Sequence, residues 1–305
     1  MAVGVLAGLI ALLVGAYLLM DREKQMLSPA NRAGLSGQFI TLPGGVTHYQ
    51  LTGPDDGPLV VLVHGFSVAS YTWDRTVPAL ADAGFRVLTY DLYGRGYSDR
   101  PSGPYDLNLF TTQLVDLLTA LQIDDPVDVI GLSMGAYITA DFTARYPERV
   151  RRVTLLAPQS TSMGSDPRVS LATLPGLGEY IFTVYLGPFY MSDNSSEFES
   201  SHDSAAWRDR YLEMMNYAGF RNALLSTLRT MTGDPYEAYR ALGQLDRPVL
   251  LLWGEEDDTS PAENAPRVMD AIPQAELHLI PGARHAFAYE FPEVVNPLLV
   301  AFLQR

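Results

Sequence analysis

Short apolar runs alternate with helix-like segments over most of this 305-residue chain, and that alternation limits the fold more than any other feature. The runs are rich in Val, Leu and Ile, and they occupy residues 46–51, 59–63, 86–90, 127–131, 153–156, 249–253 and 276–280. Near-continuous apolar runs are typical of parallel strands that are buried on both faces. The pattern therefore predicts an α/β fold, with a mostly parallel central sheet flanked by helices.

Helical spacing of apolar residues is found between the runs, at residues 110–121, 134–146 and 292–303. The alternation stops between residues 159 and 245, where aromatic and Met side chains are frequent but no good strand occurs. This stretch is too long for an ordinary loop. We interpret 159–245 as a helical lid, inserted between the two parts of one core at 38–158 and 246–305.

The first 20 residues contain no charged side chain. A helix of this length spans roughly 30 Å, the thickness of a bilayer core. A cleaved signal peptide is the alternative, but no basic residue precedes the apolar run and no clear cleavage site ends it. We predict a single-pass transmembrane anchor at 1–20 and a tether at 21–37. The nearest positive charges, Arg22, Lys24 and Arg32, all follow the anchor, which favours a cytoplasmic catalytic domain.

Composition excludes several functions. The net charge is −14, whereas nucleic-acid binding requires clustered Lys and Arg. The chain has no cysteine, so disulfides, thiolate catalysis and Cys-ligated metals are excluded. No metal-ligand spacing such as H-E-x-x-H occurs, and we expect no cofactor. The expected partners are a small lipophilic substrate and, through residues 1–20, a lipid bilayer.

The strongest chemical signal is the segment Gly131-Leu132-Ser133-Met134-Gly135, which follows an apolar run and precedes a helical one. G-x-S-x-G in this context is a nucleophile elbow, in which the serine lies on a sharp strand-to-helix turn. The flanking glycines prevent crowding, and the helix N-terminus favours developing negative charge. We therefore predict Ser133 as a nucleophile.

A serine hydroxyl needs a base. Of the five histidines, His285 follows the last strand and a Pro281–Arg284 turn, at the carboxyl end of the sheet where Ser133 also lies. A third group must orient the imidazole, and Asp257 follows the strand at 249–253. The chain order Ser, acid, His favours Asp257, although the neighbouring acids Glu255, Glu256 and Asp258 are competitors.

An acyl-transfer site also needs two backbone N–H groups directed at the developing oxyanion. One is expected from Met134, the residue after the nucleophile. The other is expected from Phe66, in the turn His64-Gly65-Phe66 that follows the strand at 59–63. Because only the backbone is used, the side chains of Phe66 and Met134 are free to line the pocket.

Together these blocks resemble the α/β-hydrolase superfamily over residues 39–305. The resemblance rests on the His64-Gly65 turn, the elbow, and the block Asp91-Leu92-Tyr93-Gly94-Arg95-Gly96-Tyr97-Ser98. It rests also on Trp253-Gly254-Glu255-Glu256-Asp257 with Pro261, which is similar to a W-G-x-x-D-x-x-x-P acid loop. This similarity selects Asp257 as the triad acid over its acidic neighbours. The last matching block is the G-x-x-H turn that ends at His285. The resemblance implies an α/β-hydrolase fold with a Ser-His-Asp triad.

The scaffold hosts many reactions. Ser133 argues against epoxide hydrolases and dehalogenases, which carry Asp at the elbow. The anchor and apolar lid resemble membrane-bound monoacylglycerol lipases, so we expect a carboxylic-ester hydrolase acting on lipophilic esters. A C–C bond hydrolase, a perhydrolase and an inactive binding protein are the alternatives. The side chains expected to contact substrate are Phe66, Met134, Phe182, Tyr185, Met214 and Phe287.

Overall fold

The computed structural model describes residues 2–163, 170–187 and 201–305. Eight strands form one sheet in the order β1-β2-β4-β3-β5-β6-β7-β8. The strands are β1 (Gln38–Leu42), β2 (Gly45–Thr52), β3 (Leu59–Val63), β4 (Arg86–Tyr90), β5 (Val127–Leu132), β6 (Val150–Leu156), β7 (Val249–Gly254) and β8 (Ala275–Ile280). β3 to β8 are parallel, whereas β1 and β2 form an antiparallel hairpin at one edge.

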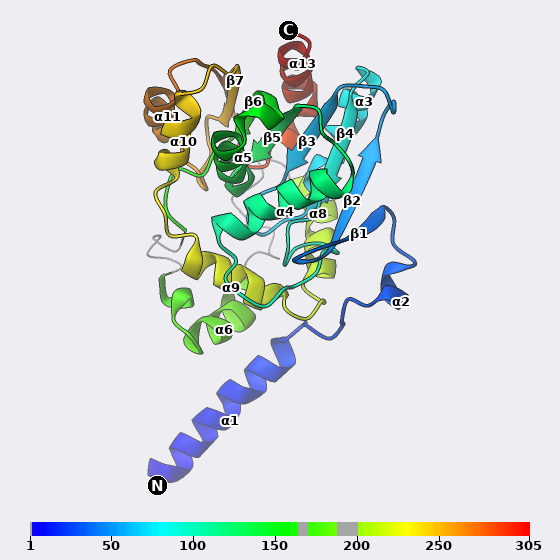
Figure 1. Ribbon diagram of the computed structural model, residues 1–305. Helices are drawn as coiled ribbons and strands as arrows, with labels where there is room; N and C mark the ends of the chain where they lie inside the picture. The colour runs from blue at the N-terminus through cyan, green and yellow to red at the C-terminus, as the bar shows by residue number, and fades with distance from the viewer. Residues whose placement is uncertain (1, 164–169, 188–200) are drawn as a thin grey trace.

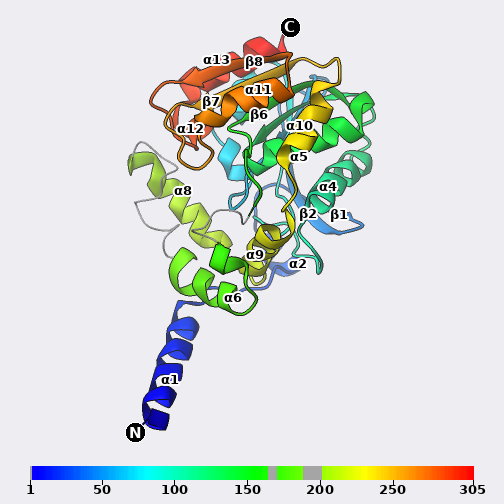
Figure 2. The same cartoon turned by 90° about the vertical axis from the view of Figure 1, so that its left-hand side faces the viewer.

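Two layers of helices cover the sheet (Figures 1 and 2). On one side α5 (Met134–Arg145) packs between α4 (Leu107–Ala120) and α10 (Pro235–Gly243), and α10 contacts α11 (Ala265–Ala271). On the other side α3 (Val77–Asp82) packs against α13 (Pro292–Leu303), which follows α12 (Phe287–Glu290). The remaining short helices of the core are η1 (Ser70–Trp73), η2 (Pro147–Arg149) and η5 (Ala262–Asn264). The predicted α/β-hydrolase fold is confirmed.

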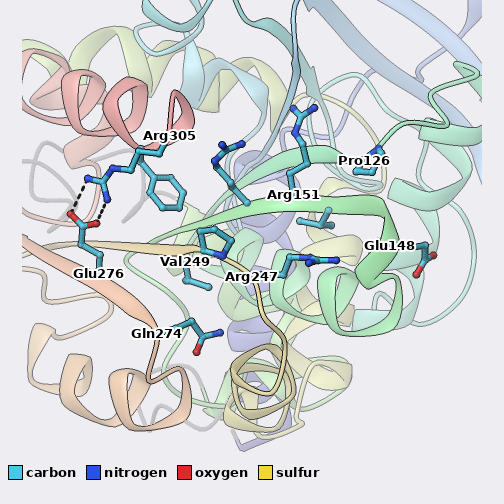
Figure 3. A pocket seen from close by; sticks show the side chains of 12 residues that line it. Pro126, Glu148, Arg151, Arg247, Val249, Gln274, Glu276 and Arg305 are labelled. Carbon is cyan, nitrogen blue, oxygen red and sulfur yellow. Dashed lines mark hydrogen bonds and ion pairs between the residues drawn. The ribbon is translucent and has the colours of Figure 1, made fainter.

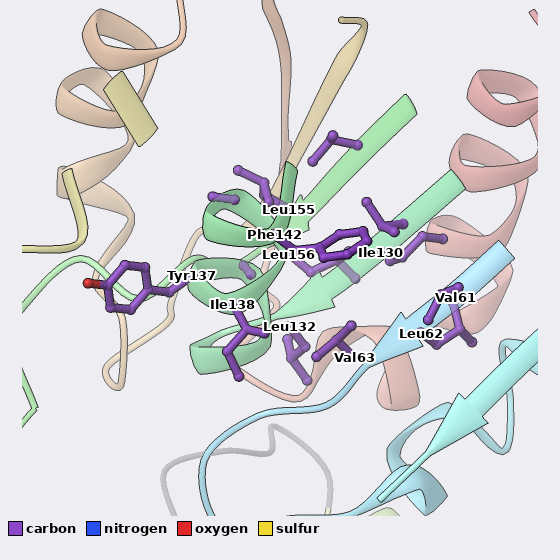
Figure 4. Packing of buried hydrophobic residues seen from close by; sticks show 14 of the residues in the cluster. Val61, Leu62, Val63, Ile130, Leu132, Tyr137, Ile138, Phe142, Leu155 and Leu156 are labelled. Carbon is purple, nitrogen blue, oxygen red and sulfur yellow. The ribbon is translucent and has the colours of Figure 1, made fainter. Parts of the chain in front are cut away.

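Burial explains the apolar runs. Every residue of β5 and of β7 is buried, as expected for strands covered on both faces. Figure 4 shows side chains of β3 and β5, such as Val63 and Ile130, packing with Ile138 and Phe142 of α5. Truncating one such side chain to Ala typically costs about 2–5 kcal/mol. This packing holds the end of β5 and the start of α5 in one rigid unit.

The lid lies between β6 and β7. Its described elements are η3 (Ser170–Thr173), α6 (Leu177–Ile181), η4 (Phe182–Leu186), α8 (Ser201–Met214) and α9 (Phe220–Thr230). A second apolar cluster joins them to loops of the core, including Val68, Tyr71 and Ala286. The predicted lid range 159–245 also contains α10, which packs on α5 and contributes Tyr239 and Leu242 to the main core.

The N-terminal helix α1 (Ala2–Met20) projects from the rest of the molecule (Figures 1 and 2). Its apolar window Val3–Met20 has none of its residues buried. It is followed by a tether that contains α2 (Pro29–Arg32). An exposed, apolar N-terminal helix of this kind is typical both of a membrane anchor and of a signal sequence.

Candidate active site

Ser133 occupies the turn between β5 and α5 in a conformation that side chains rarely adopt, with φ 56° and ψ −118°. Such a backbone costs of order 1–3 kcal/mol. The turn is possible because a glycine lies two residues before Ser133 and another lies two residues after it. A Cβ on Gly131 would lie 2.3 Å from the carbonyl oxygen of Gly135, and one on Gly135 would lie 2.2 Å from that of Val63. The predicted elbow geometry is therefore present, with Ser133 at the N-terminus of α5.

His285 and Asp257 form a buried pair. The Nδ1 atom of His285 lies 2.7 Å from Oδ2 of Asp257. The other carboxylate oxygen, Oδ1, accepts hydrogen bonds from the backbone N–H groups of Thr259 at 2.9 Å and Ser260 at 2.8 Å. An ionised carboxylate only accepts, so Nδ1 of His285 carries the proton and Nε2 is left with a lone pair. This is the tautomer that a general base requires.

The acid loop and the histidine loop are bound to each other. Glu256 donates its N–H to the carbonyl of Ala283 at 3.0 Å, and a Cβ on Gly254 would lie only 2.3 Å from that same oxygen. Asp258, a competitor of Asp257 in the sequence, is exposed and pairs instead with Arg284 at 3.1 Å. The contact with His285 thus favours Asp257 as the acid of the triad over its three acidic neighbours.

The loops that carry the predicted triad lie at one edge of the sheet, because they follow the carboxyl ends of the parallel strands β5, β7 and β8. The loop after β6 connects them. The N–H of Gln159 donates to the carbonyl of Ser133 at 3.2 Å, while the hydroxyls of Ser160 and Ser260 lie 3.3 Å apart. Ser133 and the loop of Asp257 are therefore linked through one short segment.

The predicted oxyanion turn approaches the nucleophile closely, since a Cβ on Gly65 would lie 3.5 Å from Cβ of Ser133. Within the described part of the chain, the N–H of Phe66 is bonded to no protein acceptor. Met134 occupies the first position of α5, where an N–H has no partner in its own helix. Both N–H groups are thus suited to the predicted role.

His64 fixes this turn. Its Nε2 accepts the N–H of Leu92 at 2.9 Å, so the ring proton lies on Nδ1, which donates to the carbonyl of Gly65 at 2.9 Å. Burial lowers the pKa of His64 to about 4, so the ring is neutral at neutral pH. The histidine therefore acts as a neutral connector, and the sequence did not indicate this role.

Arg95 is a second residue whose importance the sequence did not indicate. Its guanidinium is fully buried, with Nε donating to the carbonyl of Phe66 at 2.8 Å and Nη2 donating to Oγ1 of Thr227 in α9 at 2.9 Å. Burial lowers its pKa to about 9, which still leaves it charged at neutral pH. Arg95 thus ties the proposed oxyanion turn to the lid, and its place in the D-x-x-G-x-G block was the available signal.

Asp91 of the same block holds the surrounding loops together. Its carboxylate accepts from Nδ1 of His48 at 2.8 Å and from the N–H groups of Ser70 and Tyr97, both at 2.9 Å. Burial by itself raises the pKa of Asp91, but the hydrogen bond and charge of His48 lower it overall. His48 is therefore a structural histidine rather than a candidate base.

His278 is not a candidate base on this geometry either. Nε2 of His278 lies 2.8 Å from Glu276 on the edge strand β8. The side chain of His202 lies outside the described residues. Among the described residues, no group of three or more His, Asp and Glu side chains is arranged to hold a metal ion.

The predicted substrate-binding residues fall into different environments. Phe66 is half-buried between the core and the lid cluster, and Met134 is fully buried beneath the elbow. Phe182 and Met214 are buried in the lid cluster. Of the remaining two, Phe287 is wholly buried in the main core, and Tyr185 is 66% exposed on η4.

A pocket also lies at the opposite edge of the sheet (Figure 3). It is lined by residues at the amino ends of the strands, including Val150, Val249 and Arg151. The ion pair between Arg305 and Glu276 borders it. Because Ser133, Asp257 and His285 follow the carboxyl ends of their strands, this pocket is separate from the candidate site.

Known proteins share the architecture. A family model described as alpha/beta hydrolase fold matches residues 58–292. The chain is 30% identical over 263 residues to a putative non-heme chloroperoxidase of Synechocystis sp., which covers 81% of this chain and 92% of that protein. It is 27% identical to a 2-hydroxy-6-oxononadienedioate/2-hydroxy-6-oxononatrienedioate hydrolase of Burkholderia vietnamiensis, over 85% of this chain and 91% of that protein.

Among solved structures, a thermophilic esterase from Thermogutta terrifontis superposes with a TM-score of 0.73 at 25% identity, covering 88% of this chain and 98% of that one. Relatives named as an esterase, a chloroperoxidase and a 2-hydroxy-6-oxononadienedioate hydrolase thus match to similar degrees. The elbow at Ser133, the buried Asp257–His285 pair and the family match over most of the chain agree. The chain belongs to the α/β-hydrolase fold family.

Proposed function

We propose that this protein is a serine carboxylic-ester hydrolase that acts on lipophilic esters, monoacylglycerols being one class. The buried His285–Asp257 pair supports this proposal most strongly, because the contact leaves the proton on Nδ1 of His285, as a general base requires. The pair lies at the same edge of the sheet as Ser133. In this mechanism the Ser133 hydroxyl attacks the ester carbonyl and passes its proton to Nε2 of His285.

The acyl-enzyme then forms when the alcohol leaves with the proton from His285. Water, deprotonated by the same imidazole, attacks the acyl carbonyl, and the acid departs as the Ser133 hydroxyl is restored. The N–H groups of Phe66 and Met134 stabilise the oxyanion of each tetrahedral intermediate, where one donor is typically worth about 3 kcal/mol. The Asp257 carboxylate stabilises the imidazolium.

A lipophilic substrate is favoured by the surroundings of the site. The lid cluster contains Phe182, Met214 and Trp207 and reaches core residues beside the catalytic loops, including Ala286 next to His285. An acyl chain would therefore meet aromatic and thioether groups. The exposed apolar helix α1 supports a membrane location, and the positive charges after it favour a cytoplasmic catalytic domain.

Perhydrolysis and carbon–carbon bond hydrolysis are the second candidates, because the relatives include proteins named for peroxidase and hydrolase activities of these kinds. The same triad serves all three reactions. The test is a set of rates on p-nitrophenyl esters of rising chain length, monoacylglycerols, a vinylogous diketone acid, and acetate with hydrogen peroxide. We expect the ester rates to dominate and to rise with chain length; a dominant rate on either of the last two substrates would refute the ester assignment.

The location is tested separately. Alkaline carbonate extraction of membranes from an expressing cell should leave the full chain in the pellet, and protease added to sealed cells should not digest the catalytic domain. Release of a shortened chain into the supernatant would identify residues 1–20 as a signal sequence instead.

A further inference from the structure

The lid carries an unusual concentration of exposed apolar side chains. Beyond α1, seven large apolar side chains of the described residues are exposed, and four of them lie within residues 171–185. These four, Leu171 (57% exposed), Leu174 (49%), Leu177 (44%) and Tyr185 (66%), are carried by η3, α6, η4 and the turn between η3 and α6. We call them the lid apolar face. Both η3 and η4 contact α6, so these exposed side chains lie on adjoining elements rather than scattered singly over the molecule. Exposed apolar side chains concentrated in this way mark a contact surface.

The same segment is almost free of charge. Between residues 170 and 187 only Glu179 is charged, in a chain whose charged fraction is 18%. Its carboxylate is bound by the guanidinium of Arg229 at 3.0 Å and by the N–H of Gly176 at 2.6 Å. Burial by itself raises the pKa of Glu179, but the bond with Arg229 lowers it overall, so the pair stays ionised and mutually neutralised. An apolar face without net charge suits an otherwise acidic protein for contact with lipid, since cytoplasmic leaflets are themselves anionic.

The lid apolar face lies beside the end of α1. Both views show α6 next to the last turns of α1, at the end of the molecule opposite the C-terminus (Figures 1 and 2). The ring of Tyr17 in α1 stacks on that of Tyr180 in α6, with centroids 6.3 Å apart. The 19 residues of α1 span about 28 Å at 1.5 Å per residue, close to a bilayer core of roughly 30 Å. Elements that touch its last turns are therefore at the level of the bilayer interface.

The junction between α1 and the lid is built from charged contacts. The Glu23 carboxylate accepts the N–H groups of Gly219 at 2.9 Å and Arg221 at 2.5 Å, and so caps the N-terminus of α9. The Arg221 guanidinium donates to Asp21 at 3.1 Å and to Thr183 in η4 at 2.7 Å. These bonds fix the lid to the first residues after α1, so the lid cannot turn freely away from the surface that α1 enters.

We propose that the lid apolar face lies in the interface of the same bilayer that α1 spans, so that the lid is a second membrane contact of the protein. The proposal rests on the membrane anchor of the proposed function. In this arrangement the lid cluster behind the face opens toward lipid rather than toward bulk water. A lipophilic ester reaches the site from the bilayer.

The test uses the absence of cysteine in the chain, which allows single-cysteine labelling of the full-length protein. Leu177→Cys carries an environment-sensitive fluorophore, and the protein is reconstituted in phosphatidylcholine vesicles with or without acyl chains that bear a nitroxide quencher. The matched control is Leu279→Cys, whose leucine is 43% exposed against 44% for Leu177 but lies on the edge strand β8. Leu12→Cys reports on α1.

The expected result is that the label at 177 shifts to the blue and is quenched by nitroxide lipids, while the label at 279 is not. Quenching at 12 together with equal, weak quenching at 177 and 279 would overturn the lid contact and leave the anchor intact. Absence of quenching at 12 and 177 alike would overturn both. None of these readings depends on catalysis, so they are independent of the ester assignment.

A second experiment links the contact to turnover. The double variant Leu174→Ser with Leu177→Ser is compared with Leu279→Ser on two substrates, a soluble short-chain ester and a long-chain ester held in vesicles. We expect the double variant to lose rate only on the vesicle substrate. Equal rates of the double variant and the control on that substrate would contradict the proposal, whereas no ester turnover in the parent protein would refute the proposed function instead.

Discussion

The substitution Asp257→Asn tests how this carboxylate sets the tautomer of His285. In the native site Oδ1 accepts two backbone N–H groups, at 2.9 and 2.8 Å, and Oδ2 faces Nδ1 of His285 at 2.7 Å. An asparagine fits the same space but has one oxygen and one NH₂ group. If the NH₂ faced the two N–H groups, both donors would lose their acceptor, and the buried N–H of Ser260 left unsatisfied would cost about 1–3 kcal/mol. The oxygen therefore takes that position, and the NH₂ group turns toward His285.

The imidazole must then accept this donor at Nδ1, so its proton moves to Nε2, where no lone pair remains for the Ser133 proton. Loss of the base in this way lowers kcat by about 10⁴, or about 5.4 kcal/mol at 1.36 kcal/mol per tenfold. Because both backbone contacts are kept, we expect the free energy of unfolding to change by less than about 1 kcal/mol.

The assay is kcat on a soluble short-chain p-nitrophenyl ester, with thermal unfolding of each variant. Asp258→Asn is the matched control, since this neighbouring carboxylate is 66% exposed and pairs with Arg284. It should keep kcat within about twofold, because exposed ion pairs are worth at most about 1 kcal/mol. The tautomer argument is refuted if Asp257→Asn keeps more than a tenth of the parental kcat, or if Asp258→Asn loses as much.

Three further predictions follow from the contacts around the site. Gly254→Ala should lower kcat at least tenfold with a smaller change in KM, because the new Cβ would lie 2.3 Å from the carbonyl of Ala283 and displace the loop of His285; kcat within twofold of the parent would count against it. Arg95→Met should lower kcat about 10²-fold, because the carbonyl of Phe66 loses its 2.8 Å bond and the Phe66 N–H is no longer held toward the oxyanion. Arg95→Lys should recover part of this loss. The pKa of His64 is about 4 in the folded protein and about 6.5 in the unfolded chain. The unfolded state therefore binds more protons, and the free energy of unfolding falls as the pH drops from about 6.5 to about 4. In urea unfolding, His64→Asn should show a weaker dependence of this free energy on pH over that window, and a dependence as steep as that of the parent would refute the prediction.

The buried strands could be predicted from the sequence because parallel strands covered on both faces leave an apolar run. β3 and β4 were found at their observed bounds. β6 begins at Val150, three residues earlier than predicted, because Arg151 and Arg152 interrupt the run while both pair with Asp128. β1 was missed, because its five residues lie at the edge of the sheet, are mostly half-buried or exposed, and leave no continuous apolar run.

The chemical groups of the site could be predicted because Ser133, Asp257 and His285 each lie in a local motif at the end of a strand. The residues that position them could not, since their partners are distant in the sequence. Arg95 binds a carbonyl 29 residues away and a hydroxyl 132 residues away. The exposure of a lid residue such as Tyr185, which is 66% exposed on η4, depends on how the lid helices pack and cannot be predicted from residue type alone.

If Ser133 is a nucleophile activated by His285, it should react covalently with an electrophilic phosphorus reagent. The full-length protein is treated with a fluorophosphonate, and the site and stoichiometry are read by intact mass and peptide mapping. We expect one adduct per chain, on Ser133. No adduct should form in Ser133→Ala, and it should form far more slowly in His285→Asn. A folded protein that takes up no label, or takes it up equally in Ser133→Ala, would contradict the account and favour a hydrolase fold used only for binding.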